Sequence, residues 1–265
     1  MERSREPAPD RPRVRLAGVL VDRVDRNGAD VAMGRFMADG GRHQVVTVNT
    51  DFLRVSGGDR LFREIINASD LAVADGMPLV WLSWLRRTPL PERVTGFDLI
   101  ELACRRAAEN GIGVFLLGAA PGIADAAGAV LAVRHPGLRI AGVYSPPFGS
   151  HDQAEEDRIV EAIRAAGRCV LLVGFGAPKQ DRFIHANLDR LDVPVAIGVG
   201  CAFDILAGSI RRAPTWMQRV GLEWAWRLRM EPRRLWRRYL VEDAPLLGRL
   251  AAAAVRDGLR AGAAR

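Results

Sequence analysis

The stretch CVLLVGFGAPKQDRFIHANLDRL, residues 169–191, decides the fold class. Its first five residues form an uninterrupted apolar run, which is typical of a strand buried on both faces of a sheet. A turn containing two glycines and a proline follows, and residues 178–190 then carry apolar side chains at helical spacing. The stretch therefore predicts a strand, a tight turn and a helix in direct succession.

The same succession repeats through most of the chain. Short apolar runs are followed by longer segments of helical period, which is the pattern of βαβ units and of a parallel sheet covered on both faces. The predicted strands are residues 44–49, 71–75, 113–117, 138–143, 169–173 and 193–199. The predicted helices are residues 51–67, 97–109, 121–134, 153–166 and 178–190, and a further helix starts near residue 76. The first of these helices is expected to break at its two glycines. The sequence therefore predicts an α/β fold with a Rossmann-like, mostly parallel sheet, to which residues 14–21 add a strand or hairpin at the edge.

Length suggests one large domain or one domain with an appendage, and composition indicates a soluble globular enzyme. The 265 residues are 49% hydrophobic and 26% charged, which excludes disordered and collagen-like classes. Residues 1–13 are rich in Arg and Pro and are predicted to form a disordered arm without a secretory signal. Residues 14–210 are predicted to form the Rossmann-like domain, and residues 211–265 a basic helical appendage.

Without a secretory signal or a predicted membrane span, the protein is expected to stay in the cytosol. The longest apolar run, residues 111–124, has 14 residues and contains a proline, so it is too short to span a membrane. The three cysteines, Cys104, Cys169 and Cys201, stand in apolar contexts without C-x-x-C spacing, and we expect them to be buried free thiols.

The net charge of +7 belongs to the appendage. Residues 211–265 contain 13 Arg and 5 acidic residues, whereas the rest of the chain has 25 basic and 26 acidic residues. A cationic appendage suggests a phosphate-bearing partner, which is a nucleic acid, an anionic membrane surface or a diphosphate substrate. The appendage also holds four of the six tryptophans. Trp216, Val220 and Trp224 are spaced as one helical stripe that either docks on the core or lies at a membrane interface, and Pro232 is predicted to begin a new helix.

Polar residues and glycines follow the predicted strands, where ligands bind in open parallel sheets. Glycines there let the backbone approach a ligand, and helix starts direct N–H groups at anions. The candidate binding residues are Thr47, Asn49, Gly118, Gly174, Gly176, Lys179, Gln180 and Asp204. The dinucleotide pattern G-x-G-x-x-G with its later acidic residue and the P-loop pattern are both absent from the sequence.

Asp75 is the best candidate for a general base. It ends a buried strand just before a helix start, where partial desolvation would raise the pKa of a carboxyl group. The alternative is that Asp75 only caps that helix, a position that aspartate favours. Asp204 has the same two interpretations, and Lys179 is either a ligand contact or an ordinary surface lysine.

The sequence shows no pattern typical of a metal site. Its four histidines are isolated from one another and from the cysteines, and no D-x-D pair is present. We therefore expect neither a metal nor a cofactor, and we expect Arg, Lys and backbone amides to meet the charge of a bound diphosphate.

Several motifs together resemble the WecG/TagA/CpsF glycosyltransferases, glycosyltransferase family 26. They are TVN at 47–49, ADGMP at 74–78, ERVTGFD at 92–98, GFGAPKQ at 174–180, GCAFD at 200–204, RAP at 212–214, and the tail pattern E-W-x-x-R-L-x-x-E-P-x-R-x-x-R-x-Y at 223–239. The resemblance covers roughly residues 14–240, in order. Residues 241–265 lie beyond it and are predicted to form a loosely ordered helix.

The resemblance implies an inverting, metal-independent transferase at the inner membrane face of a bacterium. Such enzymes move a hexose, N-acetylmannosamine, its uronic acid or glucose, from UDP to a sugar on a polyprenyl diphosphate. It implies that Asp75 is the base, that Thr47 and Asn49 position the donor, and that Arg93 and Gln180 line the same pocket. Arg227, Arg234 and Arg237 would meet a diphosphate from an appendage that closes over the site and binds the membrane.

Two alternatives of other classes stay open from the sequence. One is a nucleotide-dependent oxidoreductase on the same type of sheet, which the missing dinucleotide pattern disfavours. The other is a nucleic-acid-binding protein that uses the Arg/Trp appendage, although the resemblance implies no nucleic acid. The sugar, the polymer and the oligomeric state, a homo-oligomer included, are not determined by the sequence.

Overall fold

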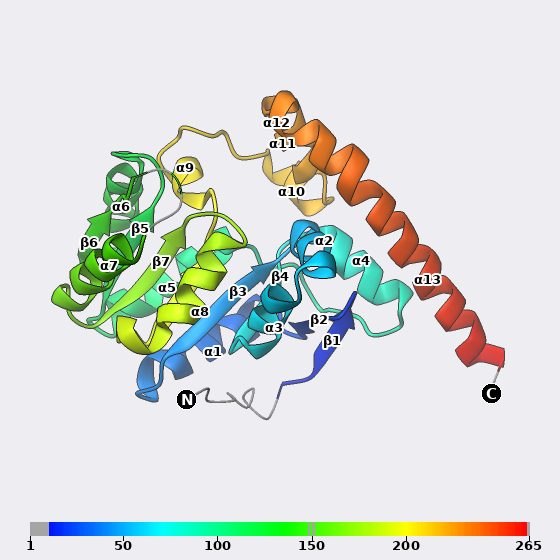
Figure 1. Ribbon diagram of the computed structural model, residues 1–265, viewed down its shortest axis with the longest axis horizontal. Coiled ribbons are helices and arrows are strands. Elements are labelled where there is room, and N and C mark those ends of the chain that lie inside the picture. The colour runs from blue at the N-terminus through cyan, green and yellow to red at the C-terminus, as the bar shows by residue number, and fades with distance from the viewer. Residues whose placement is uncertain (1–10, 148, 150–151, 264–265) are drawn as a thin grey trace.

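The computed structural model describes residues 11–147, 149 and 152–263 and confirms the predicted α/β architecture (Figure 1). Six parallel strands form one sheet in the order β4-β3-β8-β7-β5-β6. The strands are β3 (His43–Val48), β4 (Leu71–Ala74), β5 (Gly113–Gly118), β6 (Ile140–Tyr144), β7 (Cys169–Gly174) and β8 (Val195–Gly198). Because β3 lies between β4 and β8 and is parallel to both, the carboxyl ends of these three strands lie together at one edge of the sheet.

Helices cover both faces of this sheet, as its two buried faces require. The helices α1 (Arg26–Ala38), α5 (Gly96–Glu109), α6 (Ile123–Arg134) and α9 (Ala202–Leu206) pack on one face. The other face is covered by α2 (Thr50–Gly58), α3 (Arg60–Ala68), α4 (Met77–Leu85), α7 (Gln153–Ala165) and α8 (Lys179–Leu191). The break predicted at the two glycines separates α2 from α3, and Asp59 caps α3 by accepting from the Phe62 N–H.

The N-terminal strands form an antiparallel hairpin of their own, β1 (Arg13–Leu16) and β2 (Val19–Asp22). The hairpin is fastened to the main sheet where the Ala72 N–H donates to Asp22 Oδ2 at 2.8 Å. The predicted arm falls mostly on residues 1–10, which lie outside the described residues. Residues 11–13 of the predicted arm are described, and Arg13 belongs to β1. The first strand therefore begins one residue before the predicted domain boundary at residue 14.

The appendage consists of short helices followed by one long one. They are α10 (Thr215–Arg219), α11 (Glu223–Met230), α12 (Pro232–Trp236), the π-helical turn η1 (Arg237–Asp243) and α13 (Ala244–Ala263). In Figure 1, α10 to α12 lie beyond the sheet, and the red helix α13 runs back beside α4. Leu246, Leu247, Leu250 and Ala251 pack against the core beside α4, so this part of α13 is docked on the body.

The prediction of one helical tryptophan stripe is wrong. Gly221, at φ +77°, separates α10 from α11, since only glycine adopts this conformation readily. Trp216, Val220 and Trp224 are 61%, 53% and 40% exposed, so they do not dock on the core as a stripe. Pro232 does begin a new helix, as expected. Among the helices of the described residues, none combines the length and apolar character that a membrane span needs.

Candidate active site

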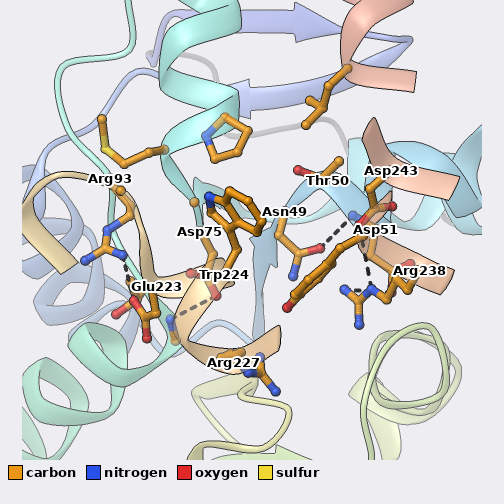
Figure 2. A pocket seen from close by; sticks show the side chains of 18 of the residues that line it. Asn49, Thr50, Asp51, Asp75, Arg93, Glu223, Trp224, Arg227, Arg238 and Asp243 are labelled. Carbon is orange, nitrogen blue, oxygen red and sulfur yellow. Dashed lines mark hydrogen bonds and ion pairs between the residues drawn. The ribbon is translucent and has the colours of Figure 1, made fainter. Parts of the chain in front are cut away.

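A cavity of about 520 Å³ lies between the carboxyl ends of β3, β4 and β8 and the appendage (Figure 2). Its floor is formed by the chain just after these strands, at residues 49–51, 75–78 and 199–202. Its walls come from α4, the start of α5, α11, η1 and α13. The sheet and the appendage thus contribute to one site, at the position where parallel sheets bind ligands.

Asp75 is on the floor of this cavity and does not cap α4, the helix that follows it. The N-terminal cap of α4 is Gly76, at φ +144°, and it makes no side-chain cap. The carboxyl group of Asp75 instead lies 3.5 Å from the Gly96 N–H, at a helix start fixed by the capping box of Thr95 and Asp98. The capping interpretation of Asp75 is therefore wrong for this structure.

The surroundings of Asp75 suit a base that works near neutral pH. Burial, followed by the nearby carboxylate of Glu223, raises the pKa of Asp75 to about 7, and Arg93 opposes this shift. Arg93 Nη1 in turn donates to Glu223 Oε2 at 2.8 Å, which joins the loop before α5 to the appendage helix α11. Both partners of this ion pair are mostly buried and line the cavity beside Asp75. A base whose pKa lies near the working pH is the most effective proton acceptor.

Asn49 has a structural task and faces the cavity as well. Its Oδ1 accepts from the backbone N–H groups of Asp51 and Phe52, which caps α2. The side chain of Asn49 extends into the space between Asp75 and Asp51 in Figure 2. A side chain held in this way is preorganised for contact with a ligand.

Arg227 and Arg238 line the cavity from the helices of the appendage, and Arg212 lines it from the segment before them. Arg227 on α11 lies with Nη2 3.3 Å from Cys201 Sγ, and its buried Nε has no hydrogen-bond partner. Arg238 on η1 lies 3.2 Å from Asp51 Oδ2 and 3.8 Å from Asp243 Oδ2. Burial raises the pKa of Asp243 to about 6, with Arg238 opposing. Together with Arg93, these two guanidinium groups place cations around the floor that holds Asp75.

Several predicted site residues do not line this cavity. Thr47 is buried in β3, two residues before Asn49, where its hydroxyl donates to the Gly198 carbonyl at 3.1 Å. Gln180 is buried as well, and its Oε1 accepts from the N–H groups of Gly176 and Gly200, which ties two strand-end loops together. The others outside the lining are Gly118, Gly174, Gly176, Lys179, Asp204, Arg234 and Arg237.

The reasons differ among these residues. A Cβ at Gly174 would meet Phe203, and one at Gly118 would meet Phe175, so these glycines make room for the protein's own packing. Lys179 is exposed, with Nζ 3.4 Å from the Gly149 carbonyl. Arg234 pairs with Glu231 at 2.5 Å and Arg237 with Glu242 at 3.6 Å, and both arginines point to the outside of the appendage.

Sequence reasoning missed three residues of the site. Glu223 stands in the tail pattern but received no role, and Arg238 and Asp243 carried no signal beyond the general basicity of the segment. The π-helical turn explains this: it changes the helical register between residues 237 and 243, so Arg238 rather than Arg237 faces the cavity. The prediction of buried thiols is confirmed for Cys104 and Cys169 and is wrong for Cys201, which is half-buried in the cavity wall.

Comparison with known proteins shows the family of the chain. The family described as Glycosyl transferase WecG/TagA/CpsF family matches residues 14–259, so the likeness extends beyond residue 240 into α13. An N-acetylglucosaminyldiphosphoundecaprenol N-acetyl-beta-D-mannosaminyltransferase of Bacillus subtilis (strain 168) is 31% identical over 83% of this chain and 81% of its own. The enzyme of the same name from Staphylococcus aureus (strain MW2) is 29% identical over 73% of this chain and 74% of its own.

Proposed function

From the premise that the chain belongs to the WecG/TagA/CpsF family and is a glycosyltransferase, we propose that it moves a hexose from a UDP-sugar to a sugar carried on a polyprenyl diphosphate. N-acetylmannosamine is the first candidate, because the relatives' names state this sugar and an acceptor on diphosphoundecaprenol. Its uronic acid and glucose are the other candidates. Membership of this family does not support the alternative of an oxidoreductase or of a nucleic-acid-binding protein.

The position of Asp75 carries this proposal. A carboxylate on the cavity floor takes the proton from the acceptor hydroxyl as that oxygen bonds to C1 of the donor sugar. The bond between C1 and the UDP oxygen breaks on the opposite side, so the configuration at C1 inverts and UDP leaves with the electron pair. A pKa of about 7 lets Asp75 be ionised in the resting enzyme and still hold the proton afterwards.

We propose further that arginines neutralise the departing UDP without a divalent ion. Arg227 and Arg238 line the cavity with Asp75, and guanidinium groups form charge-assisted hydrogen bonds with phosphate oxygens. The unpartnered Nε of Arg227 is a donor that is available for such an oxygen. Removing one preorganised donor of this kind typically lowers kcat by about 10²–10³.

The roles of the other predicted residues follow their places in the structure. Arg93 and Asn49 contact substrate in this proposal, whereas Thr47 and Gln180 position the strand ends beneath it. Gly118, Gly174, Gly176, Lys179 and Asp204 would contact a ligand only if it extends beyond the cavity toward β5 and β7.

We propose that the appendage also binds the cytoplasmic face of the inner membrane. Trp216, Trp236 and Leu240 are more than half exposed, and exposed arginines stand between them. Aromatic and basic side chains together favour an anionic membrane interface. Sedimentation with vesicles containing anionic lipid tests this: the full chain should bind, and Trp216→Ser with Trp236→Ser should weaken binding several-fold. Equal binding of both proteins would contradict it.

The transferase proposal is tested by UDP release from a panel of UDP-hexoses. The acceptor is N-acetylglucosamine diphosphate esterified to farnesol, and EDTA is present throughout. We expect acceptor-dependent release with one donor, and a loss of about 10²–10⁴ in kcat for Asp75→Asn. Asp125→Asn, at an exposed site on α6, is the matched control and should retain full activity. Release that requires an added divalent ion would contradict metal independence, and full activity of Asp75→Asn would contradict its role.

A further inference from the structure

The side of the cavity between α4 and the long helix is apolar, in contrast with the charged floor. It is lined by Met77, Trp81 and Leu85 of α4 and by Leu240, Ala244 and Leu247 of η1 and α13, which together are called the α4–α13 groove below. In Figure 2 the pale green ribbon of α4 and the pink ribbon of α13 flank this upper part, above Asp75 and Asn49.

We infer that the α4–α13 groove binds the first isoprene units of the polyprenyl-diphosphate acceptor. This inference rests on the proposed function and adds to it a binding site for the lipid part of the acceptor. Nothing in the transfer chemistry itself requires such a site, because the reacting hydroxyl lies on the sugar.

The shape of the groove suits an isoprenoid chain that starts near the base. Residues 77, 81 and 85 are spaced four apart along α4, and residues 240, 244 and 247 form a matching stripe on the facing helix. At 1.5 Å per residue the α4 stripe is about 12 Å long, the length of a few isoprene units. The groove belongs to the same cavity as Asp75, so one molecule can occupy both.

The groove also continues to the surface through apolar walls. Trp81, Leu85 and Leu240 are 39%, 43% and 53% exposed, and the exposed Trp84 and Val241 stand next to them in the sequence. A long lipid can therefore leave the cavity along apolar side chains.

Other occupants fit the groove less well. The base and ribose of the donor need hydrogen-bond partners, and the six side chains that define the groove offer almost none. A peptide would leave its own backbone groups unpaired against these walls. An isoprenoid has no polar group to satisfy, and removing it from water into an apolar groove is favourable in proportion to the area buried.

The inference is tested with two acceptors that differ only in their lipid part. The buffer contains no membranes and no detergent micelles. One is N-acetylglucosamine diphosphate on farnesol and the other carries a propyl group. We expect the KM of the native enzyme to be at least ten-fold lower for the farnesyl acceptor. Ala244→Trp should raise that KM at least ten-fold and leave the KM values of the propyl acceptor and of the UDP-sugar unchanged. Ala252→Trp, on an exposed face of the same helix and outside the cavity, is the matched control and should resemble the native enzyme.

A second measurement needs no turnover. Farnesyl diphosphate with a diazirine on its last isoprene unit is irradiated with the full chain, and the labelled peptides are identified by mass spectrometry. Labels should fall within residues 77–85 and 240–251 and should decrease at least five-fold in Ala244→Trp but not in Ala252→Trp. Labels confined to other segments would overturn the inference, as would equal KM values for the two acceptors.

The two measurements also separate this inference from the proposed function. Transfer to both acceptors with equal KM values, together with labels outside the groove, would remove the lipid site and leave the transferase intact. Labels in the groove without transfer from any UDP-hexose would support the lipid site and contradict the proposed reaction.

Discussion

Glu223 lies on the appendage, yet its carboxylate acts on a residue of the sheet. It accepts from Arg93 and raises the pKa of Asp75 through charge repulsion, in addition to the larger effect of burial. Two like charges near one another disfavour ionisation of the more buried one. Docking of α11 thereby adjusts the basicity of a residue about 150 positions earlier in the chain.

This arrangement predicts a shift in the pH dependence of transfer. In the native enzyme, kcat/KM should rise with pH toward a plateau above about 7, because Asp75 must be ionised to accept a proton. Glu223→Gln removes a negative charge but can still accept from Arg93, so the pKa of Asp75 falls and the rise moves to lower pH. The measurement is kcat/KM from pH 5 to 9, with Glu161→Gln on the exposed face of α7 as the control. An unmoved profile would contradict this role for Glu223.

At the scale of elements, η1 determines which arginine reaches the cavity. The π-helical turn interrupts a run of helix that extends from α12 to α13, and such turns are frequent at functional sites. Arg54 of α2 and Arg238 of η1 share the carboxylates of Asp51 and Asp243, with the Arg54–Asp51 pair at 2.6 Å. These pairs hold η1 against α2 at the edge of the site.

Neighbouring arginines therefore provide a matched test. Arg238→Gln should raise the KM for the UDP-sugar and lower kcat, with a combined loss of about 10²-fold in kcat/KM, because it removes a cation from the cavity. Arg237→Gln removes the same charge from the outer surface and should change kcat/KM less than two-fold in solution. Steady-state kinetics of both variants give the comparison, and equal losses would show that the register of η1 does not select between them.

The turn between α10 and α11 is a second element that the site depends on. A Cβ at Gly221 would lie 2.8 Å from Met77 Cβ and Cγ and 3.0 Å from Trp81 Cζ2, so this turn packs directly on α4. Gly221→Ala should displace α11, together with Glu223 and Arg227, and lower kcat/KM at least ten-fold. Gly208→Ala has nearly the same φ, +78°, but no atom within 4 Å of the new Cβ, and it controls for backbone strain alone. Similar activities of the two variants would contradict the packing argument.

At the scale of the whole molecule, buried carboxyl groups make stability depend on pH. Asp181 is fully buried in α8, and burial raises its pKa to about 7. A carboxyl whose pKa is raised on folding favours the folded state at low pH, and that contribution is lost as the pH rises from about 4 to about 7. The protein should therefore be less stable at pH 8 than at pH 5.

Asp181→Asn removes this titration. Between pH 5 and pH 8, the Tm of the variant should decrease by about 4 °C less than the Tm of the native protein, or by a still smaller amount. One pKa unit corresponds to about 1.4 kcal/mol of unfolding free energy, and 1 kcal/mol corresponds to about 2–4 °C in Tm for a domain of this size. Calorimetry at the two pH values measures the difference in Tm within each protein. A loss of stability that the new amide causes equally at both pH values therefore cancels. Asp125→Asn is the exposed control, and equal decreases in all three proteins would refute the prediction.

The sheet and its helices could be predicted from the sequence because their signals are local. Apolar runs such as residues 169–173 and the helical period after them depend on neighbours in the chain, and the structure confirms six strands at nearly the expected places. The position of Asp75 after a buried strand was local as well. The prediction of one helical stripe from Trp216 to Trp224 is wrong because Gly221 adopts a left-handed conformation, which the spacing of the apolar residues does not reveal.

The sequence by itself determined the class of fold, the end of the sheet at which the cavity lies and the candidate base. Only the tertiary structure decided which side chains surround that base. Arg93 and Glu223 are 130 residues apart, and Arg238 lines the cavity from η1 while it pairs with Asp51, far away in the chain. Such contacts are set by how the appendage packs on α2 and α4, and packing depends on the whole core rather than on any local pattern. The same packing creates the apolar groove between α4 and α13.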